Sequence, residues 1–155
     1  VGPENENYWS FGDSYIKGAW IMHTLRNVID NDSLWWSILR SFAVEYSRSH
    51  VKTADFQHHV EARTDEDFKY FFNQYFFDHR PPELEYYQDG NKLLYRWADV
   101  IQDFQMPMDI NINGIEKRIY PTAAVQTLET PEFAVIIFRD WEFLVKVKEN
   151  SAVSG

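Results

Sequence analysis

The spacing of apolar residues changes once along the chain. Between residues 14 and 77 the apolar residues recur every three or four positions, which is the period of amphipathic helices. From residue 84 onward they come in short runs separated by turn residues, which is typical of strands. The pattern predicts an α+β fold, in which an N-terminal helical half of about four helices is followed by a small seven-stranded antiparallel β-sandwich.

The helical half divides at polar breaks. The first helix is predicted to begin at Asp13 or Ser14, either of which can cap free backbone N–H groups, and to end at the sequence DNDS. Thr64, with Asp67 three positions later, resembles a capping box and predicts the start of the last helix. The prolines at 81 and 82 prevent that helix from continuing. The second, third and fourth helices are predicted over residues 33–46, 53–60 and 64–77.

Seven short segments after the prolines have strand character. The Asp-Gly of QDGNK and the Asn-Gly of NINGIE tolerate the positive φ angles of tight turns, so each predicts a hairpin. The segments are LEYYQ, KLLYRWAD, MDININ, IEKRIYP, AAVQTLE, FAVIIFRD and EFLVKVK. The change from helix to strand predicts two domains, residues 1–80 and residues 81–155.

Composition narrows the classes of partner. A formal net charge of -9, without a local basic cluster, predicts that nucleic acid is not a partner. No apolar run approaches the ~18 residues of a membrane span, so none is predicted. The chain has no cysteine, which excludes disulfides and thiolate zinc sites and leaves the compartment open.

The common sequence signatures of hydrolases and nucleotide-binding proteins are missing. No two of the five histidines are four positions apart, as two zinc ligands on one helix would be. His58 and His59 are neighbours, so on a helix their rings diverge by about 100°, and both are predicted to lie at the surface. There is no Gly-x-Ser-x-Gly elbow, phosphate loop or dinucleotide fingerprint. The acidic TDEDF is best explained as a first helical turn that the helix dipole stabilises.

Tyr15, in SFGDSYIKGAW, stands at the start of the first predicted helix. One interpretation is structural: the ring packs on its neighbours and the hydroxyl reaches water. The order of the motifs around it favours another. Y-x-K-G-A and WIMHTLRNVI are followed by SLWWSILRSF, KTADFQHHVE, DFKYFFNQYFF and PPELEY. Over roughly residues 10 to 87 this succession resembles the C-terminal part of the catalytic domain of the aminopeptidase N-like zinc metallopeptidases, the gluzincin family that includes the leukotriene-hydrolase aminopeptidases.

The resemblance implies a catalytic role for Tyr15. In that family the tyrosine of Y-x-K-G lies across the active site from the zinc and donates a hydrogen bond to the oxyanion that forms at the scissile carbonyl. A phenol, with a pKa of about 10, is protonated at neutral pH and can donate in this way. A helix N-terminus adds a favourable positive potential for the developing charge. Lys17 is expected to reach a carboxylate or a backbone carbonyl, and Gly18 to let another helix approach closely.

The chain departs from the family in one respect. The His-Glu-x-x-His helix, the glutamate that is the third zinc ligand and the Gly-x-Met-Glu-Asn-type strand all lie upstream of the tyrosine in the family, and this chain contains none of them. The chain also begins with Val1, as a mature product, a cleaved tag or a cut-out piece would. We therefore expect it to be the C-terminal portion of a larger metallopeptidase, the last helices of the catalytic domain plus the β-sandwich that follows.

This interpretation predicts the cofactor and the partners of the protein. The resemblance implies zinc and a peptide substrate for the complete protein, whereas the portion alone would bind no zinc and be inactive. Its partner would be the upstream catalytic domain. The apolar helical faces that pack on that domain would otherwise be exposed, or buried in a homodimer.

Five aromatic residues of the strand half support an alternative function. They are Tyr86, Tyr87, Tyr95, Trp97 and Trp141. If they gathered on the surface, the chain would be a non-catalytic helical and β-sandwich module that binds protein or glycan. We favour the other interpretation, in which they form core contacts and cross-strand pairs.

Overall fold

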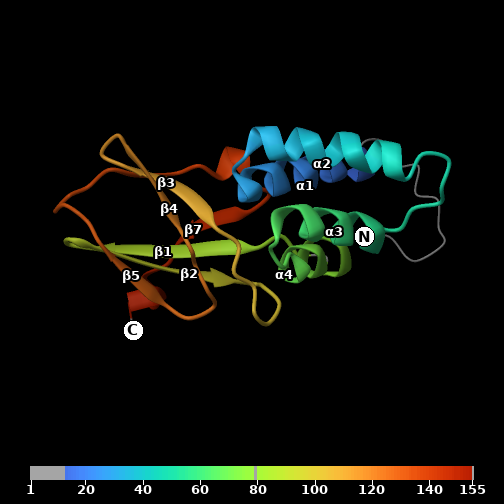
Figure 1. Ribbon diagram of the computed structural model, residues 1–155. Helices are drawn as coiled ribbons and strands as arrows, with labels where there is room; N and C mark the ends of the chain where they lie inside the picture. The colour runs from blue at the N-terminus through green and yellow to red at the C-terminus, as the bar shows by residue number, and fades with distance from the viewer. Residues whose placement is uncertain (1–12, 79, 155) are drawn as a thin grey trace.

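The computed structural model describes residues 13–78 and 80–154, and their side chains from 16 to 153 apart from that of 79. Four helices come first along the chain and seven strands follow, in two sheets, which confirms the α+β fold class. Figure 1 shows the helices at one end of the molecule and the strands at the other. No helix of the described part is long and apolar enough to cross a membrane.

The helices begin and end close to the predicted positions, with one exception. They are α1 (Asp13–Ile29), α2 (Asp32–Glu45), α3 (Thr53–Thr64) and α4 (Lys69–Phe72), and a π-helical turn η1 (Asn73–Phe77) continues α4. Asn31 caps α2, because its side chain accepts a hydrogen bond from the N–H of Leu34 at 3.0 Å. The chain leaves η1 shortly before the two prolines, as predicted.

The predicted start of the fourth helix is wrong. Thr64 is the last residue of α3, and Asp65 ends that helix in the left-handed conformation, with φ 58°. Glu61 then accepts a hydrogen bond from the N–H of Phe68 at 3.1 Å and holds the connection. The TDEDF segment is therefore mostly a linker, and α4 begins only at Lys69.

All seven predicted strands are present. They are β1 (Glu83–Asp89), β2 (Lys92–Ala98), β3 (Met108–Ile112), β4 (Ile115–Ile119), β5 (Gln126–Glu129), β6 (Ile136–Phe138) and β7 (Lys146–Glu149), with short 3-10 turns η2 (Asp140–Glu142) and η3 (Ser151–Ser154). One sheet has the order β5-β2-β1-β7 and the other β4-β3-β6. Both predicted hairpins form, and Gly90, Asn113 and Gly114 take positive φ angles in their turns.

The larger sheet is mixed rather than antiparallel. β7 pairs with β1 in parallel, with Glu83 opposite Lys146. The reason is the path of the chain, because β7 follows β6 of the smaller sheet and returns across the molecule instead of turning back in a hairpin. The division into two domains at residue 80 stays a prediction.

One cluster of buried apolar residues extends through both halves. Leu25 of α1 and Trp35 of α2 belong to it, as do Leu84 and Trp97 of the larger sheet and Ile110 of the smaller one. Polar contacts also join α1 to the strands: Thr24 Oγ1 accepts from the N–H of Leu144 at 2.8 Å, and Asn27 Nδ2 donates to the carbonyl of Glu142 at 2.7 Å. The position of α1 is thus fixed by the strand half.

Candidate active-site helix and adjoining pocket

Tyr15 lies in the first turn of α1, two residues after the helix begins. Its side chain lies outside the part that the structure describes, so its catalytic role stays a prediction. The first four N–H groups of a helix have no partner within it, so this turn carries a positive potential. An anion near the first turn of α1 would therefore be favoured.

The neighbours of Tyr15 differ from what the motif led us to expect. Lys17 is half-buried and makes no hydrogen bond or ion pair to any of the described residues. Apart from its chain neighbours and the backbone of its own helix, no described atom lies within 4 Å of the position that a Cβ would take at Gly18, so no other described helix makes the close approach expected there.

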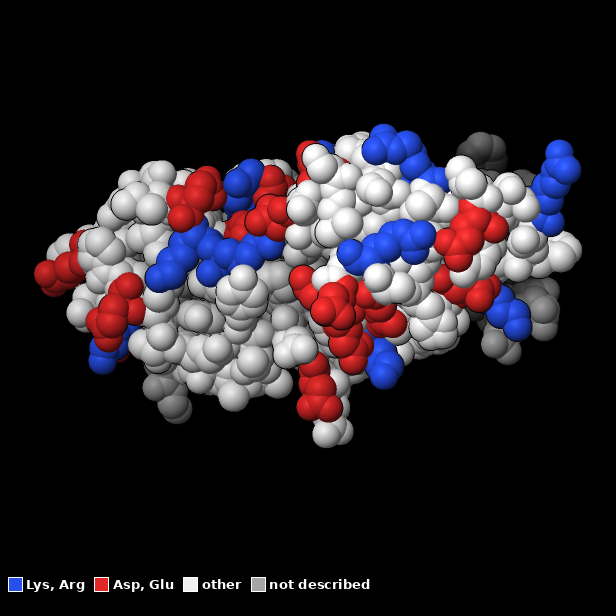
Figure 2. Space-filling model, viewed as in Figure 1, with Lys and Arg blue, Asp and Glu red and all other residues white. Residues whose placement is uncertain are grey.

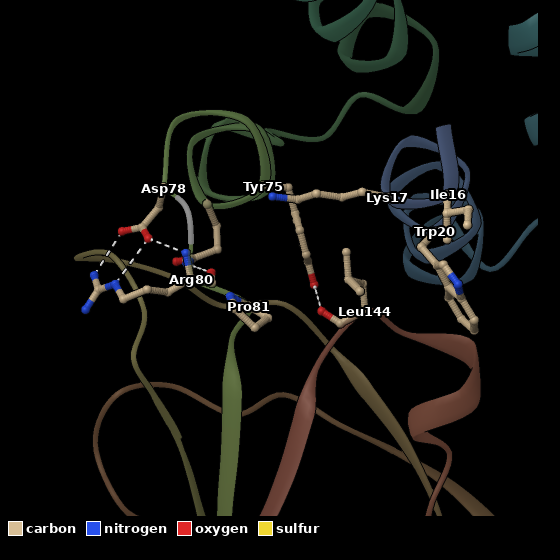
Figure 3. A pocket seen from close by; sticks show the side chains of 9 residues that line it. Ile16, Lys17, Trp20, Tyr75, Asp78, Arg80, Pro81 and Leu144 are labelled. Atoms are coloured by element: carbon tan, nitrogen blue, oxygen red, sulfur yellow. Dashed lines mark hydrogen bonds and ion pairs between the residues drawn. The ribbon is translucent and has the colours of Figure 1, made fainter. Parts of the chain in front are cut away.

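A pocket of about 250 Å³ opens between α1, η1 and the chain that leads into the strands (Figure 3). Ile16, Lys17 and Trp20 of α1 form one side of it. The other side is formed by Gln74, Tyr75, Asp78, Arg80, Pro81 and Leu144. The pocket thus lies where the helical half meets the strand half.

Two buried side chains of η1 hold the wall of this pocket. Tyr75 donates its hydroxyl hydrogen to the carbonyl of Leu144 at 2.9 Å, and burial raises the pKa of this phenol well above its ordinary value. Gln74 is fully buried and uses both ends of its amide, donating to the carbonyl of Arg80 at 2.9 Å and accepting from the N–H of Ile101 at 2.8 Å. These bonds fix both side chains in place, so they form a rigid part of the wall.

Asp78 and Arg80 pair at the rim of the pocket. Arg80 Nε donates to Asp78 Oδ1 at 3.1 Å and Nη2 donates to Oδ2 at 2.9 Å. The hydrogen bond to Asp78 raises the pKa of the Arg80 guanidinium above its usual value. The two charges largely neutralise each other, which leaves Lys17 as the uncompensated charge among the described lining residues.

The described residues do not fit a zinc ion. Nowhere in residues 13–78 and 80–154 do three or more His, Cys, Asp or Glu side chains gather in a way that could hold a metal. The prediction that His58 and His59 both lie at the surface is wrong for His59, which is 3% exposed. His59 lies on the same stripe of α3 as Phe56 and Val60, at helical spacing, and this pattern could have predicted its burial.

The ring of His59 makes four polar contacts, three of them with α2 and one within α3. Nε2 lies 3.0 Å from Ser41 Oγ and 3.2 Å from the carbonyl of Ile38, while Nδ1 lies 3.0 Å from Arg63 Nη1 and 3.3 Å from Glu45 Oε2. The Arg63 guanidinium can only donate to Nδ1 and the Ile38 carbonyl can only accept from Nε2, so these two contacts favour the neutral ring with its proton on Nε2, whereas the Glu45 carboxylate beside Nδ1 favours a proton there. The Ser41 hydroxyl donates to the carbonyl of Ile38 at 3.0 Å, within its own helix, so these contacts are those of a structural group that joins the two helices.

The five aromatic residues of the strand half do not form an aromatic surface. Trp97 and Tyr95 are buried, and Tyr86 and Tyr87 are half-buried. Trp141 is 53% exposed, with the guanidinium of Arg139 5.8 Å from its ring centroid. Tyr86 lies opposite Tyr95 on the neighbouring strand, so the interpretation as core contacts and cross-strand pairs holds for Trp97, Tyr95 and Tyr86. These residues do not supply the aromatic surface on which the alternative function depends.

Apolar side chains are exposed on the helices. Ile16 and Trp20 of α1 and Trp36 and Val44 of α2 are all exposed, and Ile16 is 61% exposed. On the face in Figure 2, acidic and basic side chains lie interspersed between uncharged areas over both halves. Ile16 and Trp20 are four positions apart and so lie on one face of α1, and exposed apolar side chains that gather in this way are typical of a surface that another part of a protein covers.

Comparison with known proteins supports a distant structural relationship. No family model matches the sequence, and no curated protein matches it. Among solved structures, the chain is similar to part of the aminopeptidase A of Legionella pneumophila, whose crystal structure was determined in complex with aspartic acid, with a TM-score of 0.63 and 15% sequence identity. The match covers 88% of this chain and 18% of that protein, so the chain spans less than a fifth of its length. At this identity the likeness concerns the fold.

Proposed function

We propose that this chain is the C-terminal portion of a zinc-dependent metallopeptidase of the aminopeptidase type, and that Tyr15 stabilises the transition state of peptide-bond hydrolysis in the complete protein. The observation that carries the proposal is the likeness in fold to part of an aminopeptidase over 88% of the chain. The motif Y-x-K-G-A at the start of α1 supports it independently, since the fold match rests on only 15% sequence identity.

The chemistry of the first turn of α1 suits the role proposed for Tyr15. When water attacks a peptide carbonyl, its oxygen becomes negatively charged, and a neutral phenol can donate a hydrogen bond to it. The N–H groups of the same turn have no partner within the helix and favour negative charge there. Removing a single donor of this kind typically slows turnover by about 10²–10³.

The remaining machinery is assigned to the upstream part of the complete protein. Since no described residues fit zinc, the zinc ligands and the general base belong to an upstream catalytic domain under this proposal. The exposed apolar residues of α1 and α2 are the surface on which that domain would pack. The division at residue 80 would then separate the end of the catalytic domain from a β module.

The gene and its complete product test the proposal. We expect the open reading frame to continue upstream of residue 1 into His-Glu-x-x-His, with a glutamate about one helix pair later. The complete product should hydrolyse aminoacyl anilides, and the 155-residue chain alone should not. A reading frame that begins at residue 1, or a zinc-loaded complete product without anilide hydrolysis, would contradict the proposal.

A further inference from the structure

We propose that the pocket beside Lys17 is a binding site for a small carboxylate with an apolar body. Its volume of about 250 Å³ lies just below the roughly 300–1,000 Å³ of pockets that take drug-sized ligands. It therefore suits a ligand with one ring or a short aliphatic chain. Figure 3 shows Lys17 extending from α1 toward η1, on the side of Tyr75.

The unused hydrogen-bonding groups determine the class of ligand. Gln74 and Tyr75 have their polar atoms bonded within the protein, so they form a fixed wall. The three N–H donors of Lys17 have no partner among the described residues. Arg80 bonds to Asp78 through Nε and Nη2, so its Nη1 is still able to donate to a ligand. A ligand that satisfies this pocket must accept hydrogen bonds, as a carboxylate does.

The charge of the pocket agrees with an anionic ligand. Lys17 and Arg80 are positive and Asp78 is negative, so the lining carries a net positive charge in a chain whose formal net charge is -9. Lys17 is half-buried and has no counter-ion among the described residues, so an anion that reaches its ammonium would gain a charge-assisted hydrogen bond.

Apolar side chains supply the rest of the site. Ile16, Trp20, Pro81 and Leu144 line the pocket around the charged groups. They would contact the body of the ligand while its carboxylate faces Lys17. An apolar lining with few polar groups is the usual composition of small-molecule sites.

The pocket lies on a different face of α1 from Tyr15. Successive residues of an α-helix are rotated by about 100°, so Lys17 is about 200° around the axis from Tyr15, and Trp20 about 140°. Ile16 and Trp20 also belong to the surface on which the upstream domain would pack, so the site is proposed for the 155-residue chain on its own. It is tested in that chain without any measurement of peptidase activity.

Calorimetric titration of the full 155-residue chain tests the site, with phenylacetate as the probe and phenylacetamide as the matched neutral compound. We expect phenylacetate to bind at least about tenfold more tightly, because only its carboxylate pairs with Lys17. Lys17→Met should weaken phenylacetate binding by about tenfold and leave phenylacetamide binding unchanged. Lys92→Met, at an exposed lysine of the β1–β2 hairpin, is the matched control and should change neither.

A second variant distinguishes loss of the binding site from loss of folding. Ile16→Asp places a negative charge at the pocket in an exposed side chain, so the fold should persist while phenylacetate binding weakens. Circular dichroism melting curves check that each variant is folded. Equal binding of the acid and the amide, unchanged phenylacetate binding in Lys17→Met, or no saturable binding up to about 10 mM phenylacetate would overturn the proposal.

Discussion

Arg118→Met would remove the contacts that join the end of α1 to the smaller sheet. The guanidinium of Arg118 forms two hydrogen bonds with Asp109, at 2.8 and 2.9 Å, and the hydrogen bond to Asp109 raises the pKa of Arg118. It also donates to the carbonyls of Asn27 and Val28, at 2.6 and 3.2 Å. These two carbonyls belong to the last turn of α1, which has no intrahelical donors for them.

The expected cost follows from these contacts. Breaking a buried ion pair by removing one partner costs about 3–5 kcal/mol. The side chains of Arg118 and Asp109 are 18% and 21% exposed, so water compensates for part of the loss. Methionine keeps much of the apolar stem and its packing. We expect a loss of about 3 kcal/mol in the free energy of unfolding, or about 6–12 °C in Tm for a chain of this length.

Thermal and urea unfolding, followed by circular dichroism, measure this loss. Arg40→Met, at an exposed arginine of α2, is the control and should change the free energy of unfolding by less than about 0.5 kcal/mol. Asp109→Asn should add little to Arg118→Met, because the two residues act as one unit. A stability of Arg118→Met within about 0.5 kcal/mol of the wild type would refute the reasoning that this arginine fixes α1 to the sheet.

Three further changes have defined outcomes. Burial raises the pKa of Glu85, but hydrogen bonds from Arg96 and Asn150 outweigh it and the net pKa is lowered, so this carboxylate stabilises the fold above its unfolded pKa. Glu85→Gln should therefore be less stable than the wild type in urea at pH 7, with the difference disappearing as the pH falls through the lowered pKa; a difference independent of pH would be contrary to this account. Tyr75→Phe should lose about 1–2 kcal/mol in urea unfolding, because the carbonyl of Leu144 loses its donor, and no loss would mean that this bond is replaced. Asn31→Ala should lose about 1 kcal/mol in the same assay through the cap of α2, and an unchanged midpoint would argue against the cap.

Local patterns in the sequence were sufficient to predict most elements. The helical period, the Asp-Gly and Asn-Gly turns and the proline pair act within a few residues, so the helices and both hairpins could be predicted from them. The start of α4 could not, because it depends on Glu61 accepting from Phe68 across seven positions. The parallel pairing of β7 with β1 likewise joins segments that no local pattern relates.

The pocket was not predicted because its walls come from distant segments. Lys17 is part of the Y-x-K-G-A motif, whereas Gln74, Tyr75 and Leu144 belong to no sequence motif that would predict a site. Tyr75 looks like one more aromatic of a Phe-rich helix until its hydroxyl is found on the carbonyl of Leu144, 69 residues along the chain. Only the folded arrangement brings these groups to the first turns of α1.

The most direct test of the central claim is the turnover of Tyr15→Phe in the complete, zinc-loaded protein. Phenylalanine keeps the ring and the start of α1 and removes only the hydrogen-bond donor. The account predicts that kcat for an aminoacyl anilide falls by about 10²–10³ while KM stays nearly unchanged, since the bond is made only in the transition state. Tyr120→Phe, at an exposed tyrosine that follows β4, is the matched control and should leave both constants unchanged. A kcat equal to that of the wild type for Tyr15→Phe, in a folded protein with full zinc content, would contradict the catalytic role.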